Sequence, residues 1–241
     1  IIVIITAFSN LFGTGGAPIF SIERGKGNHA KAGLLMNTSF TLLALCAVIL
    51  MIAGLLFARP ILVLFGASDA GLAYAYPYLM IYLLGTFPSM AATGMNPFIN
   101  AQGYATTGMI SVIIGAITNL LLDPLFIFAF HLGVRGAALA TILSQAVSCI
   151  WVLSFLCGKK TILHIRKKNL ILKPEIILPC VALGLATFIM QASESIISVC
   201  FNSSLLKYGG DIAVGAMTIL TSVMQFAMLP LQGLGQGAQP V

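Results

Sequence analysis

Charged side chains are scarce in this sequence. Only 7% of its 241 residues are Asp, Glu, Lys or Arg, against about 25% in an ordinary soluble domain, and 59% are hydrophobic. This composition excludes a water-soluble globular protein. Because a membrane-spanning helix needs about 20 mostly apolar residues, we predict an all-α, polytopic membrane protein with almost no chain left for a soluble domain.

The sequence also lacks the patterns that carry out chemistry on a substrate. Its three histidines lie in or next to loops, and its five cysteines show no CxxC or Cys/His metal spacing. No Ser/His/Asp or HExxH arrangement is present, so we expect no enzyme activity and no cofactor. The basic residues lie between apolar runs, not along a face interleaved with aromatic residues, which argues against nucleic acid and favours the lipid bilayer as partner.

Long apolar runs predict seven membrane spans, at residues 1–22, 36–57, 74–100, 106–130, 134–157, 175–206 and 212–237. Two of these runs are long enough that we expect tilting, a kink or an interfacial end. Successive loops must alternate between the two faces of the membrane. Nine of the twelve basic residues then fall on one face, in loops 23–31 and 158–173. The positive-inside rule places these loops in the cytoplasm of a multi-pass cell-membrane protein.

Acidic side chains are rarer still, and only two of the six lie within predicted spans, Asp123 and Glu194. A charged side chain at the centre of a bilayer costs at least about 2.5 kcal/mol, so each residue needs a reason to be there. Asp123 follows Asn119 by four residues, which puts both side chains on one helix face. Pro124 removes a backbone donor and disfavours helical geometry at Asp123, so we expect the helix to bend there.

Thr141 lies as far after the predicted outer turn near Leu132 as Asp123 lies before it, so both have a similar depth. Asn119, Asp123 and Thr141 together offer amide, carboxylate and hydroxyl oxygens, the hard ligands that Na⁺ prefers, and a protonated carboxyl can carry a proton. We predict an ion- or proton-coupling site at these three residues. In the alternative, Asp123 is protonated, hydrogen-bonded to Asn119, and serves only helix packing.

Polar residues of two other spans are candidates for a substrate cavity. Glu194 lies mid-span in residues 175–206 and shares a helix face with Gln191. Asn96, near the end of the third span, is a candidate for the same cavity. We interpret these three residues as a site for a cationic substrate or a proton, with a local hydrogen-bonded packing cluster or a helix-end cap as the alternative.

The motif G-x-G-x-x-P-apolar occurs twice, at residues 13–19 and 235–241. Six predicted spans separate the copies, so they share an orientation, as in transporters built from parallel repeats. In the alternative, both are coincidental small residues at helix contacts. The polar segment 158–174 is the candidate boundary between two lobes.

Several stretches resemble the multidrug and toxic compound extrusion (MATE) family of transporters. They are residues 94–103, 119–124, 133–141 and 232–240. The resemblance implies a MATE-like two-lobe helical bundle of twelve helices, of which this fragment carries about helices two to eight. Residues 1–157 would be the N-terminal lobe without its first helix, 158–174 the basic inter-lobe loop, and 175–241 the first two helices of the C-terminal lobe.

The resemblance also implies an activity. The complete protein would act as a monomer that exports small organic, cationic drugs in exchange for Na⁺ or H⁺ by alternating access. Asn119, Asp123 and Thr141 match the family's coupling positions, and Glu194 resembles an acid that some members carry on helix seven. One alternative is a flippase for lipid-linked oligosaccharide or peptidoglycan precursors, which needs basic side chains in its cavity. Another is a membrane scaffold subunit without transport.

Overall fold

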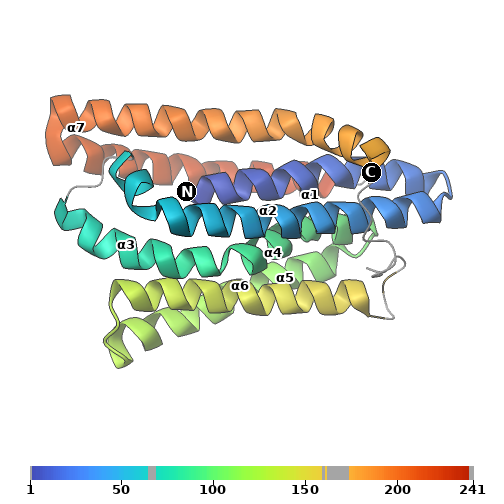
Figure 1. Cartoon of the computed structure of the whole chain (residues 1–241), viewed down its shortest axis with the longest axis horizontal. Coiled ribbons are helices and arrows are strands. Elements are labelled where there is room, and N and C mark those ends of the chain that lie inside the picture. The colour runs from blue at the N-terminus through green and yellow to red at the C-terminus, as the bar shows by residue number, and fades with distance from the viewer. Residues whose placement is uncertain (1, 65–68, 159–160, 162–173, 239–241) are drawn as a thin grey trace.

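The computed structural model of the chain describes residues 2–64, 69–158, 161 and 174–238. These residues contain helices and turns but no strand, so the predicted all-α class is confirmed. The helices are α1 (Ile2–Gly25), α2 (His29–Leu64), α3 (Asp69–Leu84), α4 (Thr86–Ala101), α5 (Ala105–Pro124), η1 (Leu125–Ala129), α6 (Val134–Cys157) and α7 (Pro174–Ala238) (Figure 1).

The helices lie along the long axis of the molecule, and the chain reverses direction at its two ends (Figure 1). The α1–α2 turn, the α4–α5 turn and the end of α6 lie at one end, and the α5–α6 turn lies at the other. The first of these is called the basic end below, because Arg24, Lys26 and Lys31 lie there. This is the alternation expected from the sequence. Most of segment 158–173 lies outside the described residues.

Six helical segments are long and apolar enough to cross a membrane: Val3–Gly25, His29–Leu62, Ala105–Ala129, Val134–Cys157, Ile176–Ser198 and Gly215–Gly235. The predicted span at 74–100 is instead broken at Gly85 into α3 and α4. There Gly85 donates its N–H to the Tyr82 carbonyl at 2.9 Å, and Thr86 Oγ1 donates to the Leu83 carbonyl at 2.7 Å. The two short helices follow one another across the molecule, so together they take the place of the third predicted span (Figure 1).

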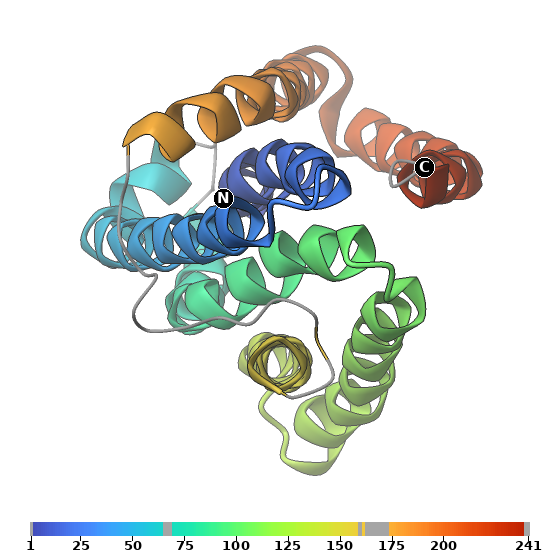
Figure 2. The same cartoon turned by 90° about the vertical axis from the view of Figure 1, so that its right-hand side faces the viewer.

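The last helix, α7, is a helical segment of 65 residues that contains two of the candidate spans. Figures 1 and 2 show that its two halves run in opposite directions. The reversal lies between the spans Ile176–Ser198 and Gly215–Gly235, at the end of the molecule opposite the basic end. The sequence predicts a turn there. The first half of α7 packs along α1.

Helix α1 lies at the centre of the molecule, between α2, α4 and α7 (Figure 2). Three of its glycines allow this close packing, because a Cβ on any of them would collide with a neighbouring helix. A Cβ on Gly13 would lie 2.6 Å from the Gly94 carbonyl oxygen of α4, and one on Gly15 would collide with the Cys180 carbonyl oxygen of α7. A Cβ on Gly16 would lie 2.7 Å from the Phe98 ring of α4 and 2.8 Å from Ser39 Oγ of α2. The first copy of the repeated motif is therefore a packing element, and the second ends outside the described residues.

Polar contacts hold the basic end together. Arg24 at the end of α1 donates from Nη1 to the Ala101 carbonyl at the end of α4, at 2.7 Å. Glu23 forms an ion pair with Lys31 at 3.0 Å, which joins the ends of α1 and α2. Thr161 donates to Gln102 Oε1 at 2.6 Å, and both side chains are almost completely buried.

Candidate functional site

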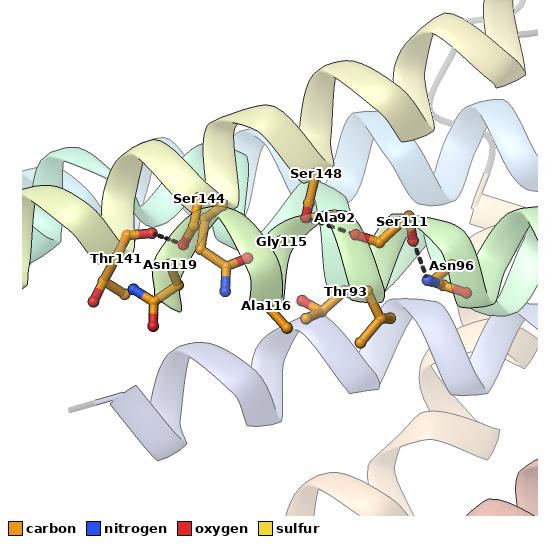
Figure 3. Close-up of a pocket in the computed structure, with 12 residues that line it drawn as sticks. Ala92, Thr93, Asn96, Ser111, Gly115, Ala116, Asn119, Thr141, Ser144 and Ser148 are labelled. Atoms are coloured by element: carbon orange, nitrogen blue, oxygen red, sulfur yellow. Dashed lines mark hydrogen bonds between the residues drawn. The ribbon is translucent and has the colours of Figure 1, made fainter. Parts of the chain in front are cut away.

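A polar pocket of about 300 Å³ lies between α4, α5 and α6 (Figure 3). It is called the coupling pocket below, because two of the three predicted coupling residues line it. Its walls are formed by Ala92, Thr93 and Asn96 of α4, Ser111, Val112, Gly115, Ala116 and Asn119 of α5, and Thr141, Ser144, Gln145 and Ser148 of α6. The structure therefore brings Asn119, Thr141 and Asn96 to one cavity.

Hydrogen bonds between helices hold one end of this pocket in a fixed shape. Asn96 donates from Nδ2 to Ser111 Oγ at 2.8 Å, and Ser148 Oγ donates to the Ser111 carbonyl at 2.8 Å. The side chains of α4 and α6 thus meet on one residue of α5 (Figure 3). These hydrogen bonds fix α4, α5 and α6 relative to one another at this end of the pocket.

At the other end, the side chains of Asn119 and Thr141 lie near one another (Figure 3). The Thr141 hydroxyl donates to the Ala137 carbonyl of its own helix at 2.9 Å, so the lone pairs of its oxygen remain available. Asn119 makes no side-chain hydrogen bond to any described residue. An amide oxygen and a hydroxyl oxygen can therefore face a cation together.

Asp123 is not among the residues that line the coupling pocket. It lies one helical turn beyond Asn119 on the same helix face. Its side chain is half-buried, and the buried Oδ1 has no hydrogen-bond partner among the described residues. The alternative in which Asp123 is bonded to Asn119 therefore has no support in this geometry.

The structure has a π-helical turn directly after Pro124, where the sequence predicts a bend. Helix α5 continues through Asp123 to Pro124, whose φ of −64° and ψ of −33° are helical, so the expected non-helical geometry at Asp123 is wrong. The next five residues, Leu125–Ala129, form a π-helical turn instead. Pro124 has no N–H, so the carbonyl of Leu120 loses its usual helical donor, and the regular pattern ends directly after the acidic residue.

A second and larger pocket, of about 720 Å³, lies between α1, α4 and α5 toward the basic end. It is called the α1 pocket below. Its walls are Asn10, Thr14, Ala17, Pro18 and Ser21 of α1, Thr93, Asn96, Pro97, Asn100 and Ala101 of α4, Ala105, Gly108, Met109 and Val112 of α5, and Gly233 of α7. Among the residues that the structure describes, no Lys, Arg, Asp or Glu lines either pocket.

The other two residues predicted for a substrate cavity line neither pocket. Gln191 follows Gly184, which contacts α1, by about two helical turns, so it lies on the same face of α7, and its Oε1 is buried without a partner. Glu194 lies ten residues after Gly184, which turns it away from that face, and it is exposed. Neither residue therefore shares one of the two pockets with Asn96.

Several pocket residues were not predicted. Ser144, Gln145 and Ser148 continue from Thr141 with spacings of three, four and seven residues, which places four polar side chains on one face of α6. This helical periodicity of polar residues inside an apolar run is the signal that could have identified them. Asn10 and Thr14 show the same spacing of four residues on α1.

The described residues contain no group of three or more His, Cys, Asp or Glu side chains that could hold a metal ion. A transition-metal centre would need such ligands. The oxygens of Asn119, Thr141 and Asp123 are instead ligands of the kind that hard cations prefer.

Comparison with known proteins gives consistent matches. The family model MatE matches residues 1–125. The multidrug export protein MepA of Staphylococcus haemolyticus is 27% identical over 241 residues, covering 100% of this chain and 53% of MepA. The chain thus spans about half the length of the curated relatives it matches.

Solved structures give the same result. The MATE multidrug transporter DinF-BH is 33% identical with a TM-score of 0.91, covering 99% of this chain and 54% of that one. An outward-facing multidrug resistance MATE family transporter of the MOP superfamily is 25% identical with a TM-score of 0.90, covering 98% of this chain and 52% of that one.

Proposed function

Because the chain belongs to the MatE family, we propose that the complete protein exports small organic, cationic substrates in exchange for Na⁺ or H⁺. The names of its relatives support this, since MepA is called a multidrug export protein and DinF-BH a multidrug transporter. Export is not catalysis, which agrees with the expected lack of enzyme activity. The proposal concerns the complete protein, because the curated relative is about twice as long as this chain.

The observation that carries the proposal is the unpaired carboxylate oxygen of Asp123, one turn from the polar end of the coupling pocket. A buried polar atom without a partner is costly, and a buried charge is costlier still. A bound Na⁺ or a proton on the carboxyl would remove that cost. Asn119 and Thr141 would supply further oxygens to a cation, and the π-helical turn after Pro124 adds carbonyls outside the regular pattern.

Coupling follows if Asp123 is charged in one conformation and neutralised in the other. A ligand shifts a conformational equilibrium only through its different affinity for the two states. Loading Asp123 with a cation would favour the conformation that buries it, and release would favour the conformation that admits substrate. Alternating access of two lobes, with residues 1–157 in one and 175–241 in the other, is part of this proposal.

The flippase alternative needs cationic side chains to hold a pyrophosphate, and neither pocket has any among its lining residues. The scaffold alternative, a subunit without transport, predicts that replacing Asp123 has no functional effect. One substitution therefore separates the scaffold from the exporter, and the pocket lining argues against the flippase.

The test is Asp123→Asn in the complete protein, which keeps the shape of the side chain and removes its charge. Export of a fluorescent organic cation from cells or liposomes should fall by about 50-fold or more, because losing a contact to a charged group worth about 2.5 kcal/mol slows a step by nearly two orders of magnitude. The assay is run with a Na⁺ gradient and with a pH gradient, which identifies the coupling ion.

Glu23→Gln is the matched control, because Glu23 is an acid at the basic end that lines neither pocket. It should export normally once both variants are compared at equal amounts in the membrane. Export at the normal rate by Asp123→Asn would contradict the proposed function.

A further inference from the structure

One face of α1 meets the first half of α7 through apolar residues. Phe8 packs against Phe188 with ring centroids 4.8 Å apart. A Cβ on Gly15 would collide with the Cys180 carbonyl oxygen, so the two backbones touch there. Nearer the basic end, Ile19 packs against the buried cluster that contains Cys180. The spacings of seven and four residues place these three α1 residues in one stripe along the helix.

Another face of α1 lines the α1 pocket with polar groups. Asn10, Thr14 and Ser21 form part of its wall, and their spacings of four and seven residues also make one stripe. At the helical repeat, this polar stripe lies roughly 140° around α1 from the apolar one. The Thr14 and Ser21 hydroxyls donate to carbonyls of their own helix at 2.7 and 3.1 Å, so their oxygens can accept hydrogen bonds from water.

The second half of α7 meets the described chain differently from the first. Figure 2 shows it on another side of α1 than the first half. Within the described residues it contributes only Gly233 to the wall of the α1 pocket, and a Cβ on Gly233 would have no atom within 4 Å. None of its span Gly215–Gly235 is buried inside the described chain. The first half is therefore held by direct contact, whereas the second half faces α1 across a cavity.

These two contacts differ in what their opening would cost. Separating α1 from the first half of α7 would expose apolar side chains, which costs free energy in proportion to the area that water reaches. The polar wall of the α1 pocket can be hydrated without that cost. Two helices that touch through small residues can also turn or slide against one another without separating.

We propose that the contact between α1 and the first half of α7 is the axis about which the lobe containing α7 turns. The α1 pocket then opens and closes as the second half of α7 moves across it. This inference rests on the proposed function, since it requires alternating access of two lobes. It adds which contact between the lobes stays closed throughout the cycle and which one changes.

Two pairs of cysteines distinguish the axis from the moving wall. Phe8→Cys with Phe188→Cys lies within the axis contact, and Met109→Cys with Gly233→Cys spans the α1 pocket between α5 and α7. Each pair is joined by a short bifunctional thiol reagent whose bonds a reductant reverses. Ion-driven export by the complete protein in liposomes is measured before cross-linking, after it and after reduction, so each double variant serves as its own control.

The native cysteines that are not buried, Cys46, Cys157 and Cys200, are first replaced by alanine. The cross-linked axis pair should keep at least about half of its export rate, because a turn about this contact leaves the contact intact. The cross-linked pocket pair should fall to about a tenth or less, because a blocked conformational step limits turnover. Reduction should restore the rate of the pocket pair.

Three results would overturn the proposed axis. They are loss of export on cross-linking the axis pair, unchanged export on cross-linking the pocket pair, and failure of the axis pair to cross-link.

Thiol labelling compares the two faces of α1 without cross-linking. Ser21→Cys lies on the pocket face and Ile19→Cys on the axis face, at nearly the same depth. During ion-driven export, Ser21→Cys should react with a charged, membrane-impermeant thiol reagent added from the predicted cytoplasmic side, and Ile19→Cys should stay protected. Equal reaction rates would mean that water enters the axis contact, which contradicts the proposal.

The two proposals fail in different ways. If Asp123→Asn abolishes export and cross-linking of the axis pair abolishes it too, the proposed function stands and only the axis is wrong. If Asp123→Asn exports normally, the proposed function itself is wrong.

Discussion

Single residues in the coupling pocket are matched in size across helices. A Cβ on Gly115 of α5 would collide with the Ser148 hydroxyl of α6, whereas the Ser148 Cβ would be 3.6 Å away, an ordinary contact. The hydroxyl in turn donates to the Ser111 carbonyl. The hydrogen bond from Ser148 of α6 to Ser111 of α5 therefore depends on the missing side chain at Gly115.

This dependence predicts a coupling between two substitutions. Gly115→Ala should destabilise the protein by about 1–3 kcal/mol through overpacking, and Ser148→Ala by about 0.5–1.5 kcal/mol through the lost hydrogen bond. The double variant should cost less than the sum, because the added methyl group then meets no hydroxyl. Thermal unfolding in detergent measures all three, and strictly additive losses would contradict the packing described for this pair.

At the scale of helices, α1 and α7 approach one another with backbone against backbone. A Cβ on Gly184 would collide with the Leu11 carbonyl, and further along the same face Phe8 and Phe188 pack edge to face with ring centroids 4.8 Å apart. Gly184 thereby sets which face of α7 meets α1. Gln191 lies on that face, and Glu194 does not.

Gly184→Ala should therefore separate the two helices and cost about 1–3 kcal/mol. Gly215→Ala on the same helix is the matched control, because nothing lies within 4 Å of its added Cβ. We expect a lower unfolding temperature for Gly184→Ala and no loss for Gly215→Ala. An equal effect of both substitutions would indicate a general response of α7 and not the crossing.

The sequence predicted helices well but their contacts poorly. Apolar runs determine where helices form, so most span positions agree with the structure. The break at Gly85 had no distinctive signal, because a glycine within an apolar run is common in membrane helices. The exposure of Glu194 depends on where Gly184 meets α1, which is a tertiary contact that no local pattern encodes.

In the candidate site, too, some features could be predicted from the sequence and others could not. The equal distances of Asp123 and Thr141 from a turn predict equal depths in neighbouring antiparallel helices. The structure instead brings Thr141 together with Asn119, one helical turn before Asp123, in one pocket. The position of Asn96 in the walls of both pockets could not be predicted, because it requires three helices to be placed relative to one another.

At the scale of the whole molecule, the alternation of turns at two ends predicts a sided protein. Lys26 is exposed at the basic end, and Arg135 is exposed near the start of α6 at the opposite end. Because basic loops remain in the cytoplasm, Lys26→Cys should react with an impermeant thiol reagent only from inside. Arg135→Cys should react only from outside. Labelling of both from the same side of intact cells would contradict the alternation.

The central position of α1 also has a consequence for how the protein is made. Inside the described chain, 56% of the span window in α1 is buried against other helices, compared with 11% in α2. A helix rich in glycine and hydroxyl groups gains little from lipid alone, whereas α2 is stable in the bilayer by itself. During biosynthesis α1 would thus depend on later helices for a stable place in the membrane. A substitution in α2, α4 or α7 that weakens the packing of these helices against α1 should then reduce the membrane integration of α1, although the sequence of α1 is unchanged.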